Sequence, residues 1–138
     1  DVDHKTPHGS SDQLFKGILD GSSRAVFSGR VLVRKDAQKT YATQSDKNLL
    51  LSEGARINTK PSLEIYADDV QCAHGATAGA IADEALFYMA SRGLDEDTAR
   101  RLLVVGFANE IIDGVRLAPL RRQMQRQLSV ETTRASAG

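Results

Sequence analysis

The stretch that decides the expected fold is LLLSEGARINTKPSLEIYADDVQC, residues 49–72. Turn-forming residues interrupt it at 52–54, 60–62 and 68–69. Between these turns, pairs of apolar residues two apart recur every six to eight residues: Leu49 and Leu51, Ala55 and Ile57, Leu63 and Ile65, and Val70 and Cys72. Side chains two apart share one face of a strand. The stretch therefore predicts short strands joined by tight turns.

Short strands at regular spacing occur in sandwiches, barrels and solenoids. The interval here is shorter than the roughly 8–12 residues usual for sandwiches, which favours a β-helix of stacked coils, although no strict sequence repeat is present. Strand-like alternation begins at Arg24, and Phe27, Val31 and Val33 share one face. A solenoid that ends at such coils exposes an unpaired edge, where a second copy or another protein can pair.

The apolar spacing becomes helical from Ile81 onward. Asp95 is suited to cap the start of a second helix, and Pro119 suits the first turn of a third. The sequence thus predicts a mixed β + α chain with three parts: a β part over 1–79, a helical subdomain over 80–129, and a disordered tail over 130–138.

The composition is that of a soluble globular protein, with 41% hydrophobic and 26% charged residues among 138. Eighteen basic and eighteen acidic residues cancel, which does not favour a nucleic-acid partner. No apolar run approaches the roughly 18 residues of a membrane span, and the single cysteine favours a reducing, cytoplasmic compartment. Because the chain starts at Asp1 without an initiator methionine, we expect it to be a segment of a longer protein.

Cys72 and His74 lie two residues apart on a predicted strand, so both side chains leave the same face. A thiolate and an imidazole there can bind one soft metal, but two ligands do not complete a tetrahedral site. The missing ligands would have to come from a partner. Two other interpretations stay open: both residues pack as ordinary core groups, or Cys72 is a nucleophile with His74 as its base. His4 and His8 flank Pro7 and are expected in a loop or on the surface.

The second predicted helix carries Val104, Val105 and Ile112 outside its main apolar stripe. Such an excess either packs against the β part or enters a groove on another protein. The sequence alone leaves both alternatives open.

Two longer runs carry a family resemblance: QSDKNLLLSEGARINTKPSLEIYADDVQCAHGATAG over residues 44–79, and DEALFYMASRG over 83–93. They resemble the SufB/SufD family of iron–sulfur cluster assembly proteins over nearly the whole chain. The combination LEIYADDVxCxHGAT points to the SufD branch, since SufB proteins typically have Glu in place of this cysteine.

The resemblance implies the C-terminal coils of a right-handed parallel β-helix, followed by a helical C-terminal domain. It also implies that the N-terminal helical region and the first coils of such a protein are not included. Members of the SufD branch pair with SufB through the β-helix and carry the ATPase SufC on their C-terminal helices. The expected role is a scaffold for a nascent iron–sulfur cluster, without enzymatic activity of its own.

Residue by residue, His74 matches the family histidine implicated in cluster formation at the SufB interface, and Cys72 is a weaker ligand candidate. The cluster would be transient and shared with a partner, so none is expected in the isolated segment. A SufC-binding surface is expected on the second and third helices, at Leu102, Val105, Phe107, Ile111, Ile112 and Leu120. The rival hypothesis is a pure interaction module, in which Cys72 and His74 only pack.

Overall fold

Two parallel β-sheets followed by three α-helices make up residues 1–135, the part of the chain that the computed structural model describes. The strands are β1 (Val2–His4), β2 (Ser10–Leu19), β3 (Arg24–Val33), β4 (Tyr41–Leu50), β5 (Arg56–Ile65) and β6 (Gln71–Gly79). The helices are α1 (Asp83–Ser91), α2 (Glu96–Ile112) and α3 (Ala118–Ala135). The expected order of strands first and helices second is confirmed.

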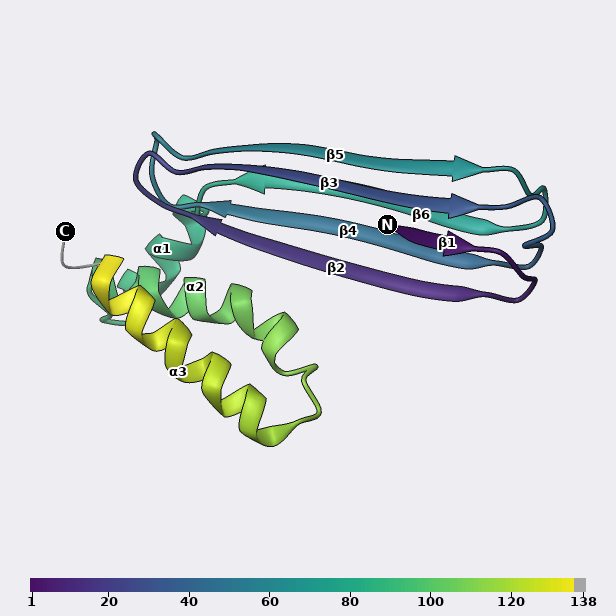
Figure 1. The fold of residues 1–138 in the computed structure, drawn as a ribbon. Helices are drawn as coiled ribbons and strands as arrows, with labels where there is room; N and C mark the ends of the chain where they lie inside the picture. Colours follow the sequence, from purple (N-terminus) through teal and green to yellow (C-terminus); the bar gives the residue numbers. More distant parts are fainter. Residues whose placement is uncertain (136–138) are drawn as a thin grey trace.

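Successive strands alternate between the two sheets, which have the orders β1-β3-β5 and β2-β4-β6. All pairings are parallel, and the strands of one sheet run opposite to those of the other (Figure 1). Strands β3 to β6 therefore each pair with the strand two before them along the chain. Ser10 lies opposite Tyr41, and Tyr41 lies opposite Gln71. Residues at equivalent positions consequently form columns across each sheet.

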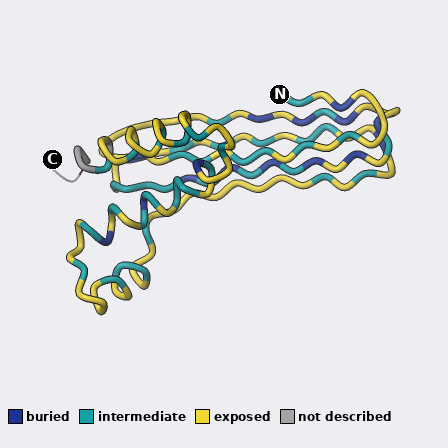
Figure 2. The backbone as a smooth tube through the Cα atoms, turned by 90° about the horizontal axis from the view of Figure 1, so that it is seen from below, coloured by how far each residue is buried: buried dark blue, intermediate teal, exposed yellow. Residues whose placement is uncertain are grey.

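The apolar core fills the space between the two sheets at the end of β3, which lies far from the helices (Figure 1). Its buried members are Val31, Val33, Ala37, Ala42 and Ala67. Val31 and Val33 are fully buried, and burying such a side chain stabilises a fold by about 1.5–3 kcal/mol. Buried segments concentrate in the strands, whereas the helices are mainly half-buried or exposed (Figure 2).

The expectation of short strands is wrong, because β2 to β5 each span ten residues. The apolar pair Leu63 and Ile65 lies in the same strand as Ile57. The turn expected at 60–62 falls in the middle of β5, where Pro61 lies opposite Gly29 of β3. A proline is tolerated there because β5 is the last strand of its sheet, and an edge strand needs hydrogen bonds on one side only.

The strands begin earlier than the pattern that starts at Arg24, because β1 and β2 precede it. The sequence hides β2 and most of β4, since their inward positions are not consistently apolar. In β4 the buried positions are Ala42, Gln44, Asp46 and Asn48. A hydrophobic period of two does not appear when the inner face is itself polar.

The helix boundaries follow the sequence signals closely. Asp95 caps α2 by accepting a hydrogen bond from the Thr98 amide at 2.9 Å, and Pro119 is the second residue of α3. The tail expected from Val130 differs, because α3 continues to Ala135; residues 136–138 of that tail lie outside the described residues. In the part of the chain that is described, none of the helices has the length and apolar character to cross a membrane.

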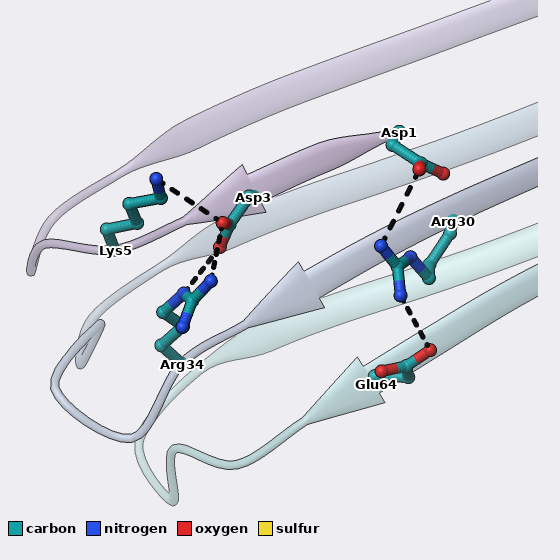
Figure 3. A network of polar contacts seen from close by, with 6 residues as sticks. All are labelled: Asp1, Asp3, Lys5, Arg30, Arg34 and Glu64. Carbon is teal, nitrogen blue, oxygen red and sulfur yellow. Dashed lines mark hydrogen bonds and ion pairs between the residues drawn. The ribbon is translucent and has the colours of Figure 1, made fainter.

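A network of ion pairs covers the outer face of the β1-β3-β5 sheet (Figure 3). Arg34 of the turn after β3 donates from both Nε and Nη2 to Asp3 of β1, each at 2.9 Å. This pairing holds the pKa of the Asp3 carboxyl below its usual value. Arg30 lies 3.6 Å from both Asp1 and Glu64. These exposed contacts join three strands, but surface ion pairs add little stability one by one.

A second charged cluster, the Lys16 anchor, attaches α2 to the β2-β4-β6 sheet. It consists of Lys16, Lys47, Phe107 and Glu110. The Lys16 ammonium forms an ion pair with Glu110, donates to the Phe107 carbonyl at 2.6 Å, and lies 4.2 Å from the centre of the Phe107 ring. Lys47 of β4 also contacts Glu110, at 3.1 Å. Hydrogen bonds from Lys16 and Lys47 lower the pKa of the Glu110 carboxyl, so Glu110 stays ionised at neutral pH.

Replacing Lys16 by alanine is expected to loosen the attachment of α2. The Lys16 side chain is only 5% exposed, so its removal deletes a buried charged hydrogen bond and a cation–π contact. We expect a loss of about 1–3 kcal/mol in the free energy of unfolding. Backbone amide exchange should accelerate in α2 more than in β3.

The matched control is Lys35→Ala, which removes a lysine from an exposed turn position and keeps the backbone carbonyl that accepts from Gln38. Equal exchange rates in α2 for Lys16→Ala and the unchanged chain would show that the anchor does not hold this helix.

Candidate functional site

Strand β6 forms an open edge of the β2-β4-β6 sheet. It pairs with β4 on one side, and no described strand pairs with its other side. All residues of β6 except Cys72 are exposed, whereas alternate residues of its neighbour β4 are buried. The unpaired donors and acceptors of such an edge are available to a strand from another chain.

Cys72 lies near the start of β6, opposite Ala42 of β4. Its side chain is half-buried and packs against the apolar core. Burial raises the pKa of the Cys72 thiol above its ordinary value of 9.0, and a hydrogen bond with the Ala42 backbone opposes this only in part. The thiol therefore stays protonated at neutral pH, which makes it a poor nucleophile and a poor metal ligand in this state.

His74 lies two residues further along β6, opposite Gln44 of β4. Its parity matches that of Cys72 and of the buried positions in β4, so the two side chains share the inward side of the strand. Unlike Cys72, His74 is exposed. It makes no side-chain hydrogen bond or ion pair with any described residue, which leaves both ring nitrogens available.

Polar side chains line the interior on β4, the strand beside His74. Gln44 donates from Nε2 to Oε1 of Gln13 at 2.9 Å, and Asn48 donates to the Asp46 carboxylate at 2.9 Å. Gln44 and Asp46 are each only 2% exposed. The interior between the sheets is therefore polar along the middle of β4, with the apolar core at the end far from the helices and the buried Leu19 and Ala55 at the other end.

Within residues 1–135, no three side chains of His, Cys, Asp or Glu come together as a metal site. His8 is exposed at a left-handed φ of 59°. His4 differs from the expected surface position, since it is buried in β1 and its Nε2 bonds the Ser11 hydroxyl at 2.9 Å. Neither histidine joins Cys72 and His74, so the pair stands without a third ligand in the described part of the chain.

The apolar residues expected to bind a partner divide into two groups. Leu102 and Leu120 are exposed, at 47% and 45%. The others are half-buried or buried: Val105, Phe107, Ile111 and Ile112. Ile112 packs within the protein at 5% exposure, and the Lys16 ammonium lies over the ring of Phe107. The apolar excess read from the sequence is thus partly used inside the chain and partly left on the surface.

The sequence model described as "SUF system FeS cluster assembly, SufBD core domain" matches residues 1–107, which include both sheets, α1 and the first two-thirds of α2. The chain belongs to the SufBD family. The family resemblance carried by residues 44–79 is therefore confirmed.

Three relatives illustrate the SufBD match. An iron–sulfur cluster assembly SufBD family protein of Synechocystis is 49% identical over 126 residues, covering 91% of this chain and 28% of that protein. The iron–sulfur cluster assembly protein SufD of Escherichia coli is 42% identical over 123 residues, covering 89% and 29%. Protein ABCI7, chloroplastic, of Arabidopsis thaliana is 47% identical over 113 residues, covering 81% and 23%. The chain spans less than a third of the length of each.

Two features near the site were not predicted from the sequence. The polar column at Gln44 lies in a run, ATQSDKN over 42–48, in which every residue after Ala42 is polar and no apolar signal appears. The Lys16 anchor joins residues 63 and 91 positions apart, and no local pattern marks such distant partners. The unbroken polar run over 43–48 was the only signal available.

The raised pKa of Cys72 predicts slow alkylation at neutral pH. Burial disfavours the charged thiolate, so the alkylation rate should reach half its maximum above pH 9.0, the ordinary value for a cysteine thiol. The measurement is the rate of iodoacetamide modification against pH. The same protein in urea serves as the control and should return to the ordinary value. A folded-state midpoint at or below 9.0 would contradict the effect of burial.

Proposed function

We propose that this chain is the C-terminal part of a SufD-type scaffold subunit for iron–sulfur cluster assembly. In this proposal the two sheets are the last coils of a right-handed parallel β-helix. The strict alternation of strands between the sheets supports it, as does the stacking of Gln13 on Gln44, 31 residues apart. A cytoplasmic location and the absence of an enzymatic activity are parts of the same proposal.

The observation that carries the proposal is an exposed histidine on an unpaired edge strand of a SufBD family protein. Here the edge of β6 pairs with SufB, and His74 offers one imidazole nitrogen to a cluster whose thiolates come from that partner. Iron–sulfur clusters are usually held by cysteine thiolates. An imidazole is a weaker ligand, which suits a cluster that is cargo and is passed on to an acceptor.

Cys72 has the lesser role in this proposal. Its raised pKa opposes ligation in the unpaired state, and its contact with the apolar core explains its presence without a metal. A second copy of this chain is another occupant that the open edge can accept.

The ATPase SufC is proposed to bind α2 and α3. Leu102 and Leu120 support this role because they are large apolar side chains left on the helix surface. The Lys16 anchor gives movement of α2 a direct path to β2 and β4. A nucleotide-driven change in SufC would then be transmitted to β4, the strand that pairs with β6.

The rival proposal is a pure interaction module that braces SufB and SufC without any ligand role. It is favoured by the lack of a third ligating side chain near His74 among the described residues, and by the packing of Cys72. The two proposals agree on the partners and differ only on His74.

His74→Ala separates them. In the reconstituted complex with SufB and SufC, we expect iron and sulfide incorporation to fall by about tenfold or more, with complex formation unchanged. His8→Ala is the matched control, since it removes another exposed histidine, which lies before β2 and therefore on the far side of β4 from β6. Full incorporation by the His74 variant would leave the interaction module as the function.

Leu102→Arg and Leu120→Arg test the helical surface. A charge placed in an apolar contact should weaken SufC binding by about tenfold or more, measured by titration calorimetry. Phe87→Arg is the control, because Phe87 is 77% exposed but lies on α1. A weakening by Phe87→Arg alone would move the SufC surface to the first helix.

A further inference from the structure

Gln44 presents a buried acceptor without a donor. Its side chain is 2% exposed, and its Nε2 is used by Gln13 at 2.9 Å. Its Oε1, by contrast, has no hydrogen-bond partner among the described residues. Leaving a carbonyl oxygen unpaired in the protein interior is costly, and such atoms are rare.

The amide of Gln44 is confined on two sides. On one side the hydrogen bond to Gln13 ties it to β2. Above it, Gly29 of β3 packs so closely that a Cβ there would lie 2.7 Å from Nε2 and 2.9 Å from Oε1. The other neighbour of β4 is β6, and the residue of β6 opposite Gln44 is His74. Neighbouring strands lie about 4.8 Å apart, a distance that two facing side chains span.

His74, by contrast, has a hydrogen-bond donor without an acceptor. Its imidazole is exposed, makes no hydrogen bond to a described residue, and always carries at least one N–H. A buried acceptor and an unpaired donor therefore occupy consecutive places in the column Gln13, Gln44, His74.

We infer that Gln44 is a positioning residue for His74: its Oε1 accepts a hydrogen bond from one ring nitrogen when the imidazole turns inward. This bond fixes the tautomer, so the other ring nitrogen carries a lone pair that faces the open edge. Histidines that bind metals are commonly oriented in this way through their second nitrogen. The inference rests on the proposed ligand role of His74 only for its consequence in cluster assembly, because the hydrogen bond itself needs no cluster.

The test is the tautomer ratio of His74, read from the ring ¹⁵N chemical shifts of the histidine-labelled full-length protein at about pH 8.5, where imidazole is neutral. His74→Ala assigns the signal. We expect one tautomer to dominate at His74, while the exposed His8 of the same protein shows the mixture of a free imidazole. Equal ratios at His74 and His8 overturn the inference without any further variant.

Three variants locate the acceptor. Gln44→Met keeps the length of the side chain but has no carbonyl, and should shift His74 to the ratio of His8. Gln44→Glu retains an acceptor oxygen and should preserve the dominant tautomer. Gln13→Met removes only the partner on the far side of Gln44 and should also preserve it. If Gln44→Met leaves the tautomer ratio of His74 unchanged, the hydrogen bond from His74 to Gln44 does not set that ratio. The same conclusion holds if Gln13→Met changes the ratio as much as Gln44→Met does.

Cluster incorporation separates this inference from the proposed function. Gln44→Met should lower incorporation by about tenfold, with rescue by Gln44→Glu. If His74→Ala leaves incorporation intact while the tautomer still depends on Gln44, the ligand role fails and the positioning contact stands. If incorporation depends on His74 but the tautomer does not depend on Gln44, the reverse holds.

Discussion

The in-register parallel stacking of β2, β4 and β6 is the constraint on which the rest of the structure depends. Strands β4 and β6 each form hydrogen bonds with the strand before them in the stack, and their residues lie in register with those of that strand. A stack of this kind has an end. At that end β6 has partners on one side only, so its residues except Cys72 are exposed even though alternate residues of β4 are buried. The exposure of His74 follows from its place in the stack.

The same stacking explains why the interior tolerates polar residues. Gln44, Asp46 and Asn48 are buried in β4, yet Gln44 and Asn48 donate to a side chain of the neighbouring strand or of the same strand. Like residues in one column can pair their side-chain amides along the stack, as Gln13 and Gln44 do through one hydrogen bond. The apolar core lies at the end of the sheets far from the helices, while Leu19 and Ala55 are buried at the other end, where the Lys16 anchor secures α2.

The sequence predicted the change from strands to helices, the cap at Asp95 and the family, because each depends on residues close together in the chain. It did not predict the length of the strands. Pro61 reads as a turn in any local window, and only the sheet order shows that it lies on an edge. Likewise, the placement of Cys72 and His74 on one face was predictable from their spacing. Their difference in burial was not, because it depends on β4 and on the apolar core.

Pro61 also affects what the open end of the two sheets can accept. In β-sheets a proline nitrogen is placed toward the free side of an edge strand, so β5 offers an interrupted row of donors there. Strand β6 contains no proline, and its row is continuous. A strand from another chain therefore finds two different edges: the edge of β5 disfavours strand addition, and the edge of β6 permits it. Such an asymmetry reduces indiscriminate aggregation and directs growth of the sheet toward the strand that carries the histidine.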